Sequence, residues 1–312
     1  SAYFGTTTTT TINASQFVGT ARSGTDLELA EPPTELVGLA NSSITKGKPV
    51  ILRTDGDYEQ VKNVTTSISF SNGTETELLG DDASQYTISY NTDQNYFVMF
   101  YRENNASNYG YGRTVRVTDK TFATTTSLGS FNTNTTQILD SVYIGNSKNL
   151  VLYRNSSNYL VARVVEIASD GTGTFGTANN IYSGSIGSKG SCYYDESKDV
   201  VVAVFGEATT TYSVIAMSVS GTTITAGSSN TSIPSGSISG LDYCASSYNP
   251  DQNIGTVAIN GYNNSKTIMS TISLSGTGNR TTTWNTPVDV NGNYTCRFGM
   301  DSFTYDPVSK KH

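Results

Sequence analysis

The stretch that decides the fold is Tyr90–Tyr101, YNTDQNYFVMFY, in which a tyrosine and a short polar turn precede an apolar run. The same order recurs at 143–153 (YIGNSKNLVLY), 194–205 (YDESKDVVVAVF) and 248–259 (YNPDQNIGTVAI), and YDP opens a fifth copy at 305–307. The five leading tyrosines stand 53, 51, 54 and 57 residues apart. A period near 50 residues predicts a stacked array or a propeller, because one such unit cannot bury its own apolar face.

Each copy continues in the same way. A polar loop with Asn, Ser and Tyr follows the apolar run, then a third apolar or alternating run, a turn with glycine, and a Thr-rich fourth run. Four short runs joined by turns predict a β-meander, and four strands per unit are what a propeller blade requires. We therefore predict an all-β fold with four consecutive four-stranded antiparallel meanders over residues 80–300, β-propeller-like. No stretch shows helical periodicity.

The first 64 residues lack the repeat and are predicted to form a separate small β-module, followed by a repeat domain at 65–312. Short strands are expected at 17–21 and 36–40, and a hairpin around Asp55–Gly56 joins 46–52 to 58–61. Residues 65–79 read as the fourth strand of a blade. The fifth copy is incomplete, so we expect either that the natural protein continues beyond His312 or that the chain is a fragment.

Composition excludes several classes of partner. The net charge is −7 and the pI is about 4.7, which argues against nucleic acid because a binding groove needs a basic stripe. No run approaches the roughly 20 apolar residues of a membrane-spanning helix, so no membrane partner is predicted. Residues 1–16 have neither the basic nor the apolar part of a signal peptide.

Residues suited to catalysis are few, and we predict that the protein is not an enzyme and needs no cofactor or metal. The only histidine is His312, which removes Ser-His-Asp and Cys-His arrangements. The three cysteines are expected as small buried residues on the first strands of blades. The candidate carboxylate pairs lie in or beside polar turns, where Asx side chains stabilise turns. These cysteines and pairs are Cys192, Cys244 and Cys296, and Asp81/Asp82, Asp195/Glu196 and Asp301/Asp306.

The repeat resembles those of structural and tail-fibre proteins of marine tailed bacteriophages. The segment 46–56, KGKPVILRTDG, is similar to a small β-module of phage virion proteins. In addition, 277–284 resembles the Asp-box hairpin of sialidase-like propellers, although Asn and Thr replace its Asp and Gly; that hairpin is structural. The phage resemblance implies a virion surface protein, a tail-fibre or appendage component, assembled as a homo-oligomer with other virion proteins through its N-terminal module. It provides no catalytic residues.

The Asn/Ser/Tyr loop in each copy of the repeat favours a sugar-binding function. Tyrosine rings beside amides and hydroxyls are typical of sugar-binding surfaces. A host-surface glycan is the candidate ligand, and packing of these tyrosines between blades is the alternative explanation. The predicted contact residues are Asn108, Tyr109, Tyr111, Asn158, Tyr159, Tyr212, Tyr262 and Asn263. Two other functions compete with the virion fibre: a secreted or cell-surface lectin-like β-propeller of a bacterium, and a polysaccharide-degrading enzyme.

Overall fold

The structure is a computed structural model, and it describes the chain in several stretches. These are residues 9–13, 35–39, 50–52, 58–60, 83–104, 107–118, 121–207, 211–231, 243–260 and 267–290. The chain divides into two compact units, Ser1–Ser71 and Asn72–His312. The strands predicted at 17–21 and 65–79, and the fifth copy, lie outside the described residues.

The first unit contains two antiparallel strand pairs. β1 (Thr9–Asn13) pairs with β2 (Glu35–Leu39), and β3 (Val50–Leu52) pairs with β4 (Tyr58–Gln60). The strands of the predicted hairpin are present and paired, while its turn lies outside the described residues, and β2 matches the strand expected at 36–40. β1 was not predicted. It belongs to a threonine-rich stretch, and threonine, being β-branched, favours extended backbone.

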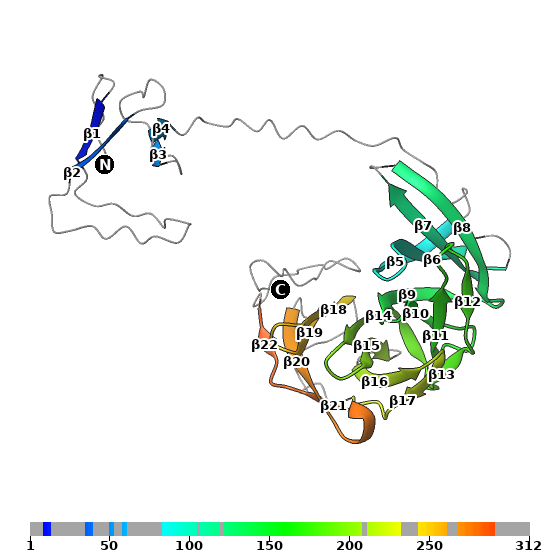
Figure 1. Ribbon diagram of the computed structural model, residues 1–312. Coiled ribbons are helices and arrows are strands. Elements are labelled where there is room, and N and C mark those ends of the chain that lie inside the picture. The colour runs from blue at the N-terminus through cyan, green and yellow to red at the C-terminus, as the bar shows by residue number, and fades with distance from the viewer. Residues whose placement is uncertain are drawn as a thin grey trace. The chain divides into compact units, whose positions relative to one another are not determined.

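The second unit contains four successive antiparallel sheets, each in the order of the chain (Figure 1). The first consists of β5 (Ala83–Asn91), β6 (Tyr96–Glu103), β7 (Gly110–Thr118) and β8 (Thr121–Asn132). The second consists of β9 (Gln137–Tyr143), β10 (Lys148–Arg154), β11 (Leu160–Ile167) and β12 (Gly173–Phe175), with β13 (Asn179–Tyr182) also on β11.

The third sheet consists of β14 (Ile186–Asp195), β15 (Val200–Glu207), β16 (Tyr212–Ser220) and β17 (Thr223–Ala226). The fourth consists of β18 (Tyr243–Asn249), β19 (Ile254–Asn260), β20 (Thr267–Ser275) and β21 (Thr281–Trp284), with β22 (Val288–Asp289) also on β20. The predicted all-β fold of repeated four-stranded meanders, β-propeller-like, is thus confirmed. The only helical element among the described residues is a single 3-10 turn at Thr277–Asn279, inside the predicted 277–284 hairpin.

The core lies between consecutive sheets, so a middle sheet buries both of its faces. On β15, Val201, Ala203 and Phe205 pack against the second sheet, while Val200, Val202 and Val204 pack against the fourth. Because side chains alternate between the two faces of a strand, a strand covered on both sides reads as an unbroken apolar run. This is why VVVAVF lacks the alternation expected of a half-buried strand.

The first strands β5, β9, β14 and β18 lie next to one another on the inner side of the four sheets (Figure 1). Buried polar side chains join them in addition to apolar ones. The buried carboxylate of Asp140 accepts hydrogen bonds from the Ser191 hydroxyl at 3.0 Å and the Cys192 backbone N–H at 2.6 Å. Ser191 in turn contacts the hydroxyl of Ser246 at 2.8 Å. Hydrogen bonds between the inner strands therefore add to the apolar contacts that hold the sheets together.

The turns that define the repeat are held by Asx side chains, as predicted. In the first turn Oδ1 of Asn91 accepts the backbone N–H of Gln94 at 3.1 Å, and the Tyr90 hydroxyl donates to Oδ1 of Asn95 at 2.5 Å. Neighbouring turns also bond to each other, since the backbone N–H of Ser147 donates to Oδ2 of Asp93 at 2.6 Å. The repeat motif thus places its turns together on one rim.

Candidate functional site

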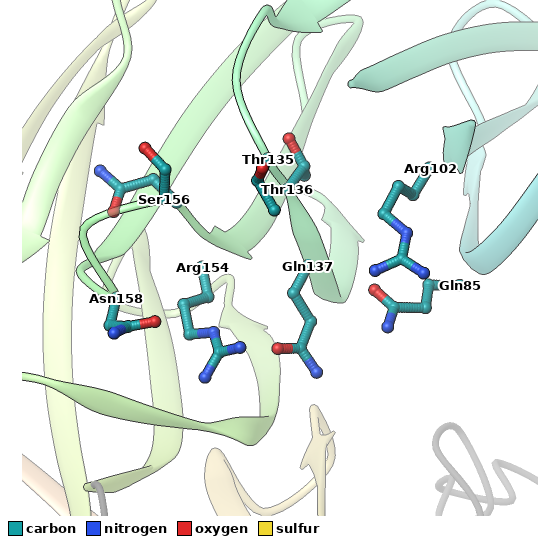
Figure 2. Close-up of a pocket in the computed structure, with 9 residues that line it drawn as sticks. Gln85, Arg102, Thr135, Thr136, Gln137, Arg154, Ser156 and Asn158 are labelled. Atoms are coloured by element: carbon teal, nitrogen blue, oxygen red, sulfur yellow. The ribbon is translucent and has the colours of Figure 1, made fainter. Parts of the chain in front are cut away.

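A pocket of about 250 Å³ lies between the first and second sheets. It is at the beginning of β5 and β9, the ends of these strands that are farthest from the repeat turns. Figure 2 shows Gln137 between Arg154 on one side and Arg102 with Gln85 on the other. The residues that line the pocket are Gln85, Arg102, Thr135, Thr136, Gln137, Arg154, Asn155, Ser156 and Asn158.

The repeat itself places the two arginines. Arg102 is near the end of β6 and pairs with Ser84 on β5, and Arg154 ends β10 and pairs with Gln137 on β9. Each arginine therefore stands at the same end of its sheet, beside the beginning of the first strand. Gln85 follows Ser84 at a bulge with a φ of 47°, where the ladder shifts register. A bulge redirects a side chain, and here it places Gln85 at the pocket.

The pocket is positively charged. None of its lining residues is an aspartate or glutamate. Nη2 of Arg102 donates to the Ser84 hydroxyl at 3.1 Å and to Oδ1 of Asn104 at 3.0 Å. Nη1 of Arg154 donates to the backbone carbonyl of Ile186 at 3.3 Å. Burial lowers the pKa of the Arg154 guanidinium from its usual value, but arginine stays charged in the physiological range.

Hydrogen bonds hold the loops around the pocket. Oδ1 of Asn155 accepts the backbone N–H groups of Ser157 and Tyr159, both at 3.0 Å. Asn158, with a φ of 63°, offers its carbonyl to the N–H of Ile186 at 2.9 Å. The N–H of Thr136 donates to the carbonyl of Asn108 at 3.0 Å. The polar groups of the pocket are therefore largely positioned before any ligand arrives.

The structure brings part of the predicted contact set to this site. Asn158 lines the pocket, and Asn108 contacts it through Thr136. Tyr109 and Tyr159 are half-buried in the loops that follow the second strands.

Tyr111 does not line the pocket. It is half-buried on β7, with its ring stacked on that of Tyr101 at 5.9 Å between centroids. Tyr262 and Asn263 lie outside the described residues.

Tyr212 is a correction. The Thr-rich segment before it was interpreted as a polar loop with Tyr212 exposed, but Tyr212 begins β16 and is only 1% exposed. Its ring lies in the core between the third and fourth sheets, and its hydroxyl donates to the carbonyl of Tyr243 at 3.1 Å. It cannot contact a glycan. The apolar residues at every second position after it, Val214 and Ala216, share its face and were the signal of a strand.

Sequence reasoning missed the arginines and glutamines of the pocket. Arg102 and Arg154 are 52 positions apart. That distance is one period, so aligning the second-strand ends of the repeats would have found them. The spatial meeting of Gln85 with Gln137 follows from the packing of the sheets.

The other candidate groups have structural roles among the described residues. Cys192 and Cys244 are free, buried and on first strands, as predicted, whereas Cys296 lies outside the described residues. Asp195 is 1% exposed and accepts a hydrogen bond from its own turn, at the N–H of Lys198, so the Asp195/Glu196 pair belongs to a turn. The other two carboxylate pairs, Asp81/Asp82 and Asp301/Asp306, lie outside the described residues.

Two kinds of feature are absent from the described stretches. No group of three His, Cys, Asp or Glu residues could hold a metal ion there. Within the same stretches, no helix is long and apolar enough to cross a membrane.

No protein-family model matches the chain, and no curated protein matches it. The solved structures that are similar to this chain include the following three. AofleA from Arthrobotrys oligospora has a TM-score of 0.45 and 11% identity, over 69% of this chain and 59% of that one. A mutant of AofleA with three arginines replaced by alanine has a TM-score of 0.46 and 6% identity, over 68% and 58%. Sqt1 from Chaetomium thermophilum has a TM-score of 0.42 and 11% identity, over 66% and 50%. The chain spans about half to three-fifths of these proteins.

Proposed function

We propose that the second unit, which contains the four sheets, is a lectin-like module. It binds a glycan without cleaving it, in the pocket between the first and second sheets. The observation that carries the proposal is the make-up of that pocket. It gathers side-chain amides, hydroxyls and guanidinium groups from two adjacent sheets and their loops. These are the groups that exchange hydrogen bonds with the closely spaced hydroxyls of a sugar ring.

The size of the pocket supports a small ligand segment. A volume of about 250 Å³ is just below the roughly 300–1,000 Å³ of pockets that enclose a drug-sized molecule. It suits one sugar residue, with the rest of the glycan outside. Tyr109 is half-buried in a neighbouring loop and offers apolar surface for that outer part, whereas Tyr159 packs against the core between the first two sheets.

A binding role is favoured over hydrolysis by the same residues. Glycoside hydrolysis uses two carboxyl groups about 5–9.5 Å apart on either side of the scissile bond. The nine lining residues include neither aspartate nor glutamate. A sugar held here would contact donors and acceptors, with no acid–base pair to break its glycosidic bond.

Where the module is located, on a virion or on a cell surface, stays a prediction from the sequence. A place on a phage virion, assembly through residues 1–64 and a homo-oligomeric state agree with a glycan-binding role. So does a secreted or cell-surface lectin-like propeller of a bacterium, because both settings present a binding module to cell-surface sugars. The chemistry of the pocket is the same in either case.

The test is a glycan array probed with the full chain, followed by calorimetric titration of each glycan that binds. Gln137→Ala should weaken binding about 2- to 10-fold, because a neutral hydrogen bond contributes about 0.5–1.5 kcal/mol. The matched control is Gln252→Ala, since Gln252 is exposed in a turn of the fourth sheet. An array without binding contradicts the proposal. Binding that is indifferent to Gln137→Ala places the site elsewhere.

A further inference from the structure

We propose that the pocket selects acidic sugars, with a carboxylate or sulfate group held between Arg102 and Arg154. This inference rests on the glycan-binding function proposed above and specifies the class of ligand. It follows from the charge of the pocket and from the way the repeat places that charge.

Both guanidinium groups lack a counter-ion within the described part of the chain. Arg102 uses its Nη2 for a hydroxyl and a side-chain amide, and Arg154 uses its Nη1 for a backbone carbonyl. A guanidinium has five N–H donors in a planar fork, so each keeps donors beyond these bonds. Partly buried charge without an opposite charge is unfavourable, and an anionic ligand would supply that charge through charge-assisted hydrogen bonds.

The two arginines have no cationic counterpart at the same position of the third and fourth sheets. Arg102 and Arg154 pair with the first residues of the third strands, Gly110 and Leu160. The residues that do so in the third and fourth sheets are Gly206 and Asn260. The third and fourth sheets therefore present a glycine and an asparagine where the first two present arginines. In a chain of net charge −7, two arginines with no counter-ion among the described residues set this pocket apart from the same end of the third and fourth sheets.

The remaining lining groups suit the rest of an acidic sugar. Gln85 and Gln137 offer amides beside the arginines, and Thr135 and Ser156 offer hydroxyls. In Figure 2 the ends of Arg154, Gln137, Gln85 and Arg102 lie in a row. The arginines would donate hydrogen bonds to the anionic oxygen of such a sugar, and the amides and hydroxyls would exchange hydrogen bonds with its ring hydroxyls. A neutral sugar would use only the amides and hydroxyls.

The experiment compares chemically matched ligands on the full chain. One pair is a polyuronate oligosaccharide and its carboxyl-reduced neutral counterpart, and the other is a sulfated galactan oligosaccharide and its desulfated form. Affinities are measured by calorimetry for wild type, Arg102→Gln, Arg154→Gln and the control Arg280→Gln. Arg280 is in the fourth sheet, just before β21, and its Nε donates to the carbonyl of Thr277. Thermal melting shows whether each variant is folded.

We expect at least one acidic ligand to bind about tenfold or more tightly than its neutral partner, because hydrogen bonds to charged groups are stronger than neutral ones. Arg102→Gln and Arg154→Gln should each remove most of that preference, while Arg280→Gln keeps it. The pair that shows the preference identifies the anion as carboxylate or sulfate. Equal binding of acidic and neutral ligands overturns this inference and leaves the glycan function in place. Absence of binding to all four ligands and to the array overturns both.

Discussion

The hydroxyl of Tyr194 donates a hydrogen bond to Oδ1 of Asp199 at 2.8 Å, and Asp199 has a φ of 52°. The same pair occurs in the fourth sheet, where the Tyr248 hydroxyl donates to Asn253 at 3.1 Å and Asn253 has a φ of 53°. An Asx residue tolerates left-handed backbone better than most residues and also offers a side-chain acceptor. This explains why a tyrosine precedes an Asn or Asp by five positions in three of the repeats.

The first prediction concerns this turn. Asp199→Ala should lower the free energy of unfolding by about 1 kcal/mol more than Asp199→Gly, because both lose the acceptor but only alanine resists the left-handed backbone. Asp199→Asn should remain close to wild type. Urea denaturation of the three variants measures the order, and an alanine variant as stable as the glycine variant would show that the turn is not left-handed.

The second prediction concerns the polar contact between the first two sheets. Nδ2 of Asn91 donates to Oδ1 of Asn149 at 2.7 Å, and both side chains are fully buried. Asn149→Ala leaves the Asn91 amide without its acceptor, which should cost about 1–3 kcal/mol. The control is Asn134→Ala, an exposed residue of the connection between β8 and β9. Equal midpoints of denaturation for the two variants would contradict the contact.

The third prediction tests the packing of the third sheet against the fourth. A Cβ at Gly255 would overlap the hydroxyl oxygen of Tyr193, so Gly255→Ala must displace a buried ring. It should cost about 1–3 kcal/mol, as overpacking of cores does.

The double variant with Tyr193→Leu should lose less stability than the sum of the single variants, because leucine removes the obstructing ring. The single tryptophan, Trp284, lies in the same core, so its fluorescence reports the unfolding. Strictly additive losses would mean that Gly255 and Tyr193 are not in contact.

The fourth prediction concerns alkaline pH. Burial raises the pKa of Tyr153 from 10.0 to about 12, and the charge of Arg163 opposes this shift only in part. Below pH 10 the hydroxyl is protonated in both states and its contribution to stability is complete. Between about pH 10 and 12 the unfolded state loses the proton first, so the free energy of unfolding falls by up to about 1.4 kcal/mol per pH unit.

Tyr153→Phe should make that fall shallower over the same interval, measured relative to the stability of each protein at pH 7. Denaturation series at pH 7, 10, 11 and 12 provide the comparison. An identical slope for the variant and wild type would show that Tyr153 does not titrate differently in the two states.

The sequence was informative wherever structure depends on neighbours along the chain. The turn after Tyr90 follows from Asn91 and Asn95, whose side chains bond within the turn. Buried cysteines on the first strands were also predictable, because a small apolar residue in such a strand rarely faces water. The failure at Tyr212 has a local cause as well, since threonines before a strand resemble those of a loop.

The candidate site was less accessible to such reasoning. Of its lining residues, only Asn158 was predicted. The tyrosines drew attention because they are the conspicuous residues of each loop, yet the pocket is built from strand ends. Arg102 and Arg154 belong to different sheets, and each looks like an ordinary exposed cation at the end of an apolar run.

The sequence by itself determined the strands, the turns and their repetition, because side-chain alternation and turn chemistry act over a few residues. Only the tertiary structure decided which strand ends meet and that two arginines share a pocket without a carboxylate. The reason is that the sheets are joined by apolar faces, which are non-directional and favour many packings about equally. The register between sheets comes from contacts such as Asn91 with Asn149, and it is this register that brings Arg102 and Arg154 to one site.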